Sequence, residues 1–149
     1  MNLLARRGVL AIAAVVDVAL HSGRGPVAAK HLTVRHKLPP RHLDLLLHGL
    51  AQANILTGVR GPRGGYKLAR ERQRITVGEI LRTAASLSTA DPEDLGAHSV
   101  LLERVIEPAV SEAGKTFIAN LDSITVDEMC VTAEKAHVLE DEKVGDLAI

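Results

Sequence analysis

Apolar residues recur every three or four positions near the start of the chain, which indicates a helix with one buried face. The sequence predicts this first helix from about residue 3 to residue 21, where the glycines of "SGRGP" end it. A second, shorter helix is predicted over residues 27–36, with a thinner apolar side. The apolar positions expected to bury the first helix are Val9, Ile12, Ala13, Val16 and Leu20.

A third helix is predicted over residues 40–53, and its two sides differ strongly. Pro40 suits its first position, because the N–H that proline lacks has no helical partner there. Its sides divide into a buried leucine face, Leu43, Leu46, Leu47 and Leu50, and an outward face, Arg41, His42, Asp44, Leu45 and His48. Two short helices joined by a tight turn are typical of a helix-turn-helix.

The stretch "GVRGPRGGYKL", residues 58–68, contains four glycines and two arginines. It lies between two short runs, residues 55–59 and 66–68, which can pair as the strands of a hairpin. Glycine permits a sharp turn with positive φ and adds no side chain that would hold the loop away from a neighbouring surface. Arg60 and Arg63 are therefore expected to project from a thin hairpin, as in the wing beside a recognition helix.

Two capping boxes mark helix starts in the second half of the chain, Thr76 with Glu79 and Thr125 with Glu128. The first is expected to open a helix that ends near residue 85. A polar loop that contains proline and glycine follows this helix.

A long helix predicted from Pro108 to Ser123 has an apolar side with no obvious partner in so small a domain. We expect this side to form a contact between two subunits, which in a soluble regulator means a two-fold dimer. The alternative is that the helix folds back on the core of its own chain. The residues expected in the dimer contact are Val110, Ala113, Phe117, Ile118 and Leu121.

These elements predict a mainly α fold with a small β-hairpin, organised as a winged helix-turn-helix DNA-binding domain plus a dimerisation helix. The DNA-binding domain is expected over residues 1–85, and a connecting loop with a short helix over 86–107. Residues 108–138 are expected to form the dimerisation helix and a following short helix. Residues 139–149 form an acidic tail that is expected to fray.

Charge divides the chain although its formal net charge is zero. Residues 1–85 carry 14 Lys/Arg and 4 Asp/Glu, and residues 86–149 carry 4 and 14, so the two parts have net charges of +10 and −10. A basic half joined to an acidic half favours a module that binds a polyanion, with a separate non-binding arm. The alternative is two solvated faces of ordinary composition.

Several other classes of protein receive no support from the sequence. One cysteine can form neither an internal disulfide nor a multi-cysteine metal site, and it fits a reducing cytoplasm. The paired arginines and apolar run near the start resemble an export signal, but Asp17 interrupts the run, which is also too short to cross a membrane. No catalytic triad, carboxylate pair or phosphate loop stands out, and the histidines lack metal-ligand spacing, so we expect neither an enzyme nor a metal site.

Two roles are open for Cys130, the single cysteine. An accessible thiol in a positive environment could act as a redox switch, for example through a disulfide across a dimer. Its acidic neighbours, Asp127, Glu128 and Glu134, disfavour a thiolate, so a buried inert cysteine is the favoured hypothesis. A thiol enzyme that uses Cys130 is a further and weaker alternative.

Three stretches together resemble the Rrf2 family of bacterial winged-helix transcriptional regulators: "RRGVLAIAAVVDVALHSGRGPVAAKHL", "LPPRHLDLLLHGLAQANILTGVRGPRGGYKLAR" and "ITVGEIL". The later "LDSITVDEM" is similar to the end of that family's dimerisation helix. The resemblance implies a dimeric DNA-binding repressor or activator. Several members of the family sense iron–sulfur status, nitric oxide or redox state through a cluster held by three cysteines between the wing and the dimerisation helix.

The loop that holds those cysteines in the family corresponds here to residues 86–99, which contain none. An iron–sulfur cluster is therefore not expected, and no other cofactor is indicated. Members without the cysteines respond to a protein partner, a small metabolite or thiol oxidation, and an effector of one of these kinds is expected for this chain.

Each predicted DNA contact depends on the chemistry of its side chain. Residues on the outward side of a recognition helix reach base edges in the major groove, where arginine pairs with guanine. Arginines on a wing suit a narrow, strongly negative minor groove, and other basic residues can position the domain on phosphates. The predicted contacts are Arg41, His42, Asp44 and His48 on the helix, Arg60, Arg63 and Gly64 on the wing, and Arg6, Arg7, Lys30, Arg35 and Lys37 for phosphates.

The leading hypothesis is a homodimeric, sequence-specific regulator, expected to repress, that binds an imperfect palindrome in double-stranded DNA. The second is a protein-interaction regulator of the same fold that has lost specific DNA reading. Asp44 and Leu45 motivate it, because they stand where the family commonly carries Glu-Gln. A leucine cannot hydrogen-bond a base edge, although it can touch a thymine methyl group.

Overall fold

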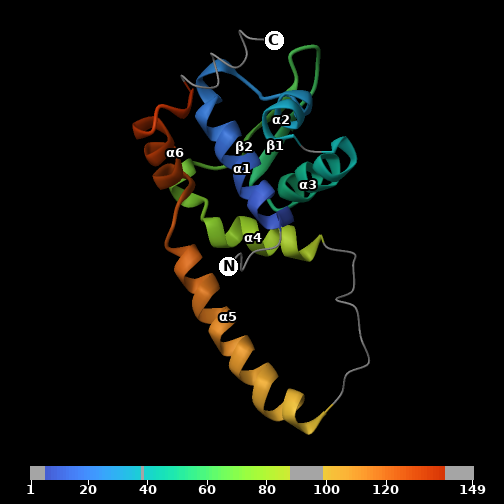
Figure 1. Cartoon of the computed structure of the whole chain (residues 1–149). Coiled ribbons are helices and arrows are strands. Elements are labelled where there is room, and N and C mark those ends of the chain that lie inside the picture. Colours follow the sequence, from blue (N-terminus) through green and yellow to red (C-terminus); the bar gives the residue numbers. More distant parts are fainter. Residues whose placement is uncertain (1–5, 38, 88–98, 140–149) are drawn as a thin grey trace.

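Six α-helices and one β-hairpin make up the part of the chain that the computed structural model describes, residues 6–37, 39–87 and 99–139. Four helices and the hairpin form a body with α1 through its middle, α6 lies on the other side of α1 from α3, and α5 extends away as an arm (Figure 1). The elements are α1 (Arg6–Leu20), α2 (Ala29–His36), α3 (Pro40–Gln52), β1 (Leu56–Val59), β2 (Gly65–Leu68), α4 (Val77–Ser86), α5 (Glu107–Asp122) and α6 (Val126–Lys135).

The centre of the core is α1, which contacts α2, α4, α6 and β2. The apolar face predicted for this helix is only partly right: Val9 is 41% exposed, and Ala13 is half-buried. The other three predicted residues, Ile12, Val16 and Leu20, are half-buried and pack against the edge of the core. Small side chains are buried instead, because they allow neighbouring helices to approach closely. The fully or nearly fully buried apolar residues of α1 are Ala11, Ala14, Val15, Val18 and Ala19.

The leucine face predicted for α3 is confirmed, because all four leucines are buried against the core. Pro40 occupies the start of α3, as expected for a residue that needs no partner for an N–H group. The turn before it is made at Lys37, which ends α2 in the left-handed region with φ 51°. The core side of α3 therefore fixes which residues point outward.

The hairpin is antiparallel and pairs Leu56 with Leu68 and Val59 with Gly65. A third segment joins it, because the backbones of Val27 and Tyr66 exchange two hydrogen bonds of 2.8 Å. The second helix was predicted to begin at Val27 but begins at Ala29, since the backbone of Val27 is used by this pairing. Only glycine fits at position 65, where a Cβ would lie 2.3 Å from the carbonyl oxygen of Val27.

The end of the described chain returns to the body through α6. Its start is joined to the start of α4 by two hydrogen bonds of 2.8 Å, from the Val77 N–H to the Ile124 carbonyl and from the Val126 N–H to the Ile75 carbonyl. Val126 is fully buried in the core, and α6 packs on α1. This short helix, expected to accompany the dimerisation helix, therefore also completes the core of its own chain.

The two predicted capping boxes differ. At Thr125 the box is complete, because the threonine hydroxyl accepts from the Glu128 N–H and the Glu128 carboxylate accepts from the Thr125 N–H. At Thr76 only the first half forms. The carboxylate of Glu79 is taken instead by the guanidinium of Arg70, which explains why the second half is missing.

The arm α5 is joined to the body at its C-terminal end. The Arg82 guanidinium on α4 donates to the Asp122 carboxylate, with 2.6 Å between Nη1 and Oδ1. At the same joint, a Cβ on Gly78 would lie 2.1 Å from the Asp122 carboxylate oxygen, so α4 and α5 meet without room for a side chain. The far end is preceded by a wide π-helical turn, Leu102–Ile106. Pro108, in the first turn of α5, lacks the N–H that an α-helical bond back into this turn would need.

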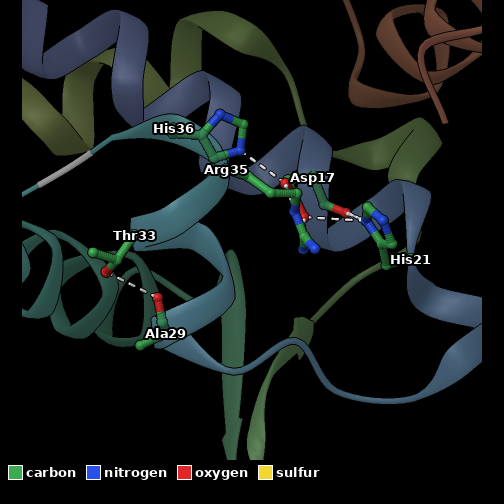
Figure 2. Close-up of polar contacts among 6 residues, drawn as sticks. All are labelled: Asp17, His21, Ala29, Thr33, Arg35 and His36. Carbon is green, nitrogen blue, oxygen red and sulfur yellow. Dashed lines mark hydrogen bonds and ion pairs between the residues drawn. The ribbon is translucent and has the colours of Figure 1, made fainter. Parts of the chain in front are cut away.

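A buried carboxylate joins α1 to α2 (Figure 2). Asp17 is 3% exposed, and its carboxylate accepts two hydrogen bonds from the Arg35 guanidinium, from Nε at 2.8 Å and from Nη2 at 2.7 Å. His36 Nε2 lies 2.7 Å from Oδ2, the oxygen that also accepts from Arg35 Nε, and His21 Nδ1 lies 3.1 Å from Oδ1. The end of α2 is therefore fixed to the last turn of α1 by charge as well as by apolar packing.

Burial alone raises the pKa of Asp17, but the hydrogen bonds from His36 and Arg35 and the charges of Arg35 and His21 outweigh it and lower the pKa to about 2. The ionised form is therefore the one that the fold stabilises. A carboxyl with a lowered pKa contributes stability that is present above its unfolded-state pKa and is lost as pH falls through its folded-state pKa.

We expect Asp17→Asn to lower the free energy of unfolding by about 3 kcal/mol, because the change removes the buried carboxylate that pairs with the largely buried Arg35 guanidinium. Urea denaturation followed by circular dichroism measures this. The matched control is Glu71→Gln, which removes an exposed ion pair with Arg74 and should cost less than about 0.5 kcal/mol. Equal costs for the two variants would contradict the role assigned to Asp17.

The same carboxylate should make stability depend on pH in the acid range. Its lowered pKa corresponds to a contribution of about 2 kcal/mol that is present above about pH 4 and is lost between about pH 4 and pH 2. Urea midpoints measured through this range should fall more steeply for the native chain than for Asp17→Asn. Parallel curves for the two proteins would contradict the assignment.

Candidate nucleic-acid interface

The outward side of α3 is exposed along its length. The residues predicted there, Arg41, His42, Asp44, Leu45 and His48, are all solvent-exposed in the structure. They combine a guanidinium, two imidazoles, a carboxylate and an apolar group that is 48% exposed. This side can therefore offer hydrogen-bond donors, an acceptor and an apolar contact to a groove of a duplex.

The hairpin loop presents both of its arginines to solvent. Arg60 and Arg63 are exposed, and within the described residues neither side chain makes a hydrogen bond or ion pair. The loop between them is tight: Gly61 has φ 115°, and its carbonyl accepts from the Gly64 N–H at 2.9 Å. A Cβ on Gly64 would lie 2.3 Å from the carbonyl oxygen of Val59, so this predicted contact residue has a structural role in the turn.

Tyr66 belongs to β2 and is near enough to α3 to be affected by the charge of Asp44. Its side chain is half-buried, and its pKa is raised by burial and by the negative charge of Asp44. The root of the hairpin is therefore close to the outward side of α3. Figure 1 shows α3 and the hairpin loop away from the arm α5, with α2 between them in this view.

The residues predicted to meet phosphates divide into two groups. Lys30, at the start of α2, is exposed, as are Arg6 and Lys37. Arg7 instead donates from Nη1 to the Leu87 carbonyl at 3.2 Å, and Arg35 is held by Asp17. These two arginines connect helices, so the structure offers Lys30 rather than Arg7 or Arg35 as a free cation.

The acidic residues of the basic half are mostly paired with arginine. Asp17 pairs with Arg35, Glu71 with Arg74 and Glu79 with Arg70. Asp44 is different, because its side chain has no hydrogen bond or ion pair to any other residue that the structure describes. The basic side chains of α3 and the wing are therefore accompanied by one unpaired carboxylate, on α3.

The predicted dimer contact residues lie along the arm. Val110 is 66% exposed and Ala113 is exposed, whereas Phe117, Ile118 and Leu121 are half-buried where α5 contacts α4. Sequence reasoning missed the apolar residues before the helix, although the run "VLLERVI" was a signal for them. The additional exposed residues are Val100, Leu101, Val105 and Ile106, with exposed fractions of 65, 60, 58 and 41%.

Cys130 is fully buried in α6. Burial is the main cause of a raised pKa for its thiol, and the nearby Arg72 opposes this only in part. No group of three His, Cys, Asp or Glu side chains is placed to hold a metal ion in residues 6–37, 39–87 and 99–139. None of the described helices is long and apolar enough to cross a membrane.

Sequence reasoning also missed the cluster around Asp17. The signal was present: one acidic residue stands in an otherwise apolar helix, with His21 one turn later. The helical spacing of four places these two side chains next to each other. What the sequence did not show is that Arg35 and His36 reach the same carboxylate from another helix.

The family model described as "Rrf2: Iron-dependent Transcriptional regulator" matches residues 4–132. The chain is similar to the HTH-type transcriptional regulator IscR of Sodalis glossinidius, with 38% identity over 78 residues, 52% of this chain and 47% of that protein. It therefore spans about half the length of the first curated relatives that it matches. A putative HTH-type transcriptional regulator of Synechocystis is 28% identical over 134 residues, 90% of this chain and 91% of that protein.

Two solved structures have the same fold. "T. potens IscR" has 32% identity and a TM-score of 0.70, over 91% of this chain and 90% of that one. CymR (YrzC), titled the global cysteine regulator of B. subtilis, has 25% identity and a TM-score of 0.64, over 89% of this chain and 98% of that one. The predicted fold, mainly helical with a winged helix-turn-helix hairpin, is confirmed.

The description of the family as iron-dependent raises the question of a cluster. A site with three thiolates does not fit this chain, which has one cysteine, and that cysteine is buried in the core. The predicted loop of residues 86–99 lies almost wholly outside the described residues. The family consists of transcription regulators and not of enzymes. The helix-turn-helix, the basic wing and the match over most of the chain agree: this protein belongs to the Rrf2 family of DNA-binding transcriptional regulators.

Proposed function

We propose that this chain acts as a homodimeric repressor that binds a palindromic operator, with α3 in the major groove and the hairpin loop in the adjacent minor groove. The observation that carries the proposal is the exposure, on both elements, of arginines that have no partner among the described residues. Both elements belong to the part of the body that lies away from α5 (Figure 1). Two-fold symmetry of the protein implies half-sites about 10 or 20 base pairs apart, one or two turns of the duplex. Repression requires only that the operator be occupied, so it is the simpler regulatory outcome.

Three side chains on α3 support recognition of a base sequence, in addition to electrostatic attraction to the DNA phosphates. Arg41 can pair with guanine, and Leu45 can touch a thymine methyl group. Asp44 is unfavourable near phosphates but can accept a hydrogen bond from the amino group of cytosine. An unpaired carboxylate on this surface weakens non-specific binding, so we infer that Asp44 contributes to discrimination between sequences.

The dimer is supported by the apolar surface of the arm. A row of apolar residues lies near one side of the arm: Leu101, Ile106, Val110, Ala113 and Phe117. The first two are five residues apart across the wide π-helical turn, and the others follow at the three- or four-residue spacing of an α-helix. Exposed apolar side chains gathered in this way are typical of a surface that another subunit covers. A second copy of the same helix is the simplest partner, since a two-fold contact uses the same surface on both subunits.

The alternative, a regulator of the same fold that acts through protein contacts without reading DNA, rests on Asp44 and Leu45. The two hypotheses differ in what the purified protein recovers from fragmented genomic DNA. Specific reading predicts a set of enriched fragments that share a palindrome. Uniform recovery of all fragments, with specific recovery of a partner protein, would favour the alternative.

We expect Arg60→Ala with Arg63→Ala to weaken binding to a recovered operator at least about tenfold, because two cations per protomer are removed near the negative minor groove. Gel shifts at several salt concentrations measure this. The slope of log affinity against log salt should become less steep by about 0.9 for each phosphate that the variant no longer neutralises.

The matched control for the wing is Arg74→Ala. This arginine is exposed, but it belongs to a short helical turn, Arg72–Arg74, that packs on α6, on the other side of α1 from α3. Its removal should leave operator affinity within about twofold. If both variants weaken binding equally, the wing has no specific role.

We expect Val110→Glu to convert the dimer to monomers, because it places a charge in the proposed apolar contact between arms. Sedimentation equilibrium measures the change, and the urea midpoint should stay unchanged, since Val110 is 66% exposed within the chain. Ser111→Glu is the control, an exposed neighbour about 100° around the same helix. A native chain that sediments as a monomer would refute this part of the proposal.

A further inference from the structure

A hollow of about 500 Å³ opens where the end of α1 meets the start of α2. Four of its lining side chains are basic: His21, Arg24, His31 and Arg35. Pro26 and Val34 add apolar surface, and Val34 is 60% exposed. A volume of this size is in the range of sites that hold small molecules.

The basic side chains of this hollow are not matched by acidic side chains among its described lining residues. Among the described residues no Asp or Glu side chain lines it, and the carboxylate of Asp17 behind it is already bound by Arg35. Arg24 and His31 are exposed, and neither side chain makes a hydrogen bond or ion pair with another described residue. An anion that entered the hollow would therefore meet an arginine whose hydrogen-bonding capacity is not used within the described chain.

We propose that this hollow binds a small oxyanion, a carboxylate or phosphate group carried on a short apolar body. The guanidinium of Arg24 can donate two parallel hydrogen bonds to such a group, and the imidazole of His31 can donate another. The apolar body would lie against Pro26 and Val34. Because the basic groups come from two separate elements, the ligand would bridge them.

Occupancy of this hollow acts on the elements that hold the recognition helix. Arg24 belongs to a short helical turn after α1, Ser22–Arg24, whereas His31 belongs to α2, which packs on α3. Val27, in the same lining, pairs with Tyr66 at the root of the wing. A bridging anion therefore changes the freedom of α2 relative to α1 and so couples to DNA binding, a consequence that rests on the function proposed above.

Binding can be tested without DNA, by ¹H–¹⁵N spectra of the native chain titrated with inorganic phosphate and with phenyl phosphate at constant ionic strength. We expect saturable shifts concentrated in residues 21–35, and at least threefold tighter binding of phenyl phosphate. Arg24→Gln should weaken binding at least about tenfold, and it should fold normally because Arg24 is exposed. Arg74→Gln is the control and should bind as the native chain does.

Shifts that are absent, spread evenly over all basic residues or unchanged in Arg24→Gln would overturn the proposal. A second arm measures operator affinity for the native chain and Arg24→Gln, with and without phenyl phosphate. If Arg24→Gln loses DNA affinity and the free protein shows no saturable shifts, the hollow contacts the DNA backbone and the proposal fails. Saturable binding of phenyl phosphate by a chain that recovers no operator would support the anion site and refute the proposed function.

Discussion

The orientation of the helix-turn-helix depends on one buried charge. Asp17 stands in the most apolar of the described helices, where an ionised carboxylate is costly without partners. Arg35 and His36 at the end of α2, and His21 at the end of α1, supply those partners. Because hydrogen bonds have stricter geometry than apolar contacts, this cluster limits how α2 can turn or slide on α1.

That constraint reaches the proposed DNA surface through packing. The leucine side of α3 is buried, and α3 packs on α2, α4 and β1, so the place of α2 helps to determine where the outward side of α3 points. The backbone pairing of Val27 with Tyr66 joins the wing to the same region. The cluster, the recognition helix and the wing therefore form a single mechanical unit, and the basic hollow opens at the edge of this unit.

Much of the fold could be predicted from the sequence, because apolar and polar positions alternate clearly in the elements that form the helix-turn-helix. In α3 that contrast identified both the buried leucines and the exposed side correctly. In α1 it identified the buried face only in part, because almost every position from 8 to 20 is apolar and more than one face fits the helical spacing. The size of side chains such as Ala11 then decides which face is buried most deeply.

Contacts between segments far apart in the chain could not be predicted from the sequence. Nothing in the side-chain pattern around Val27 shows that its backbone pairs with Tyr66. The positive charge of Arg35 was evident from the sequence, but its role was not. Arg35 pairs with Asp17, which lies 18 residues away on another helix, so it is not free to bind a phosphate. The wing loop was predictable, because glycine and arginine at close spacing have few other structural reasons to occur together.

The joint between α4 and α5 has a geometric consequence. The 16 residues of α5 extend for about 24 Å, so a tilt of about 10° at Gly78 and Asp122 displaces the distal tip by about 4 Å. Such a tilt is restricted, because α4 and α5 pack closely at Gly78 and the Arg82 guanidinium is hydrogen-bonded to the Asp122 carboxylate. In a two-fold assembly formed through α5, the angle of this joint would set the distance between the two helix-turn-helix units. That distance determines the half-site separation at which both units can bind one operator at the same time.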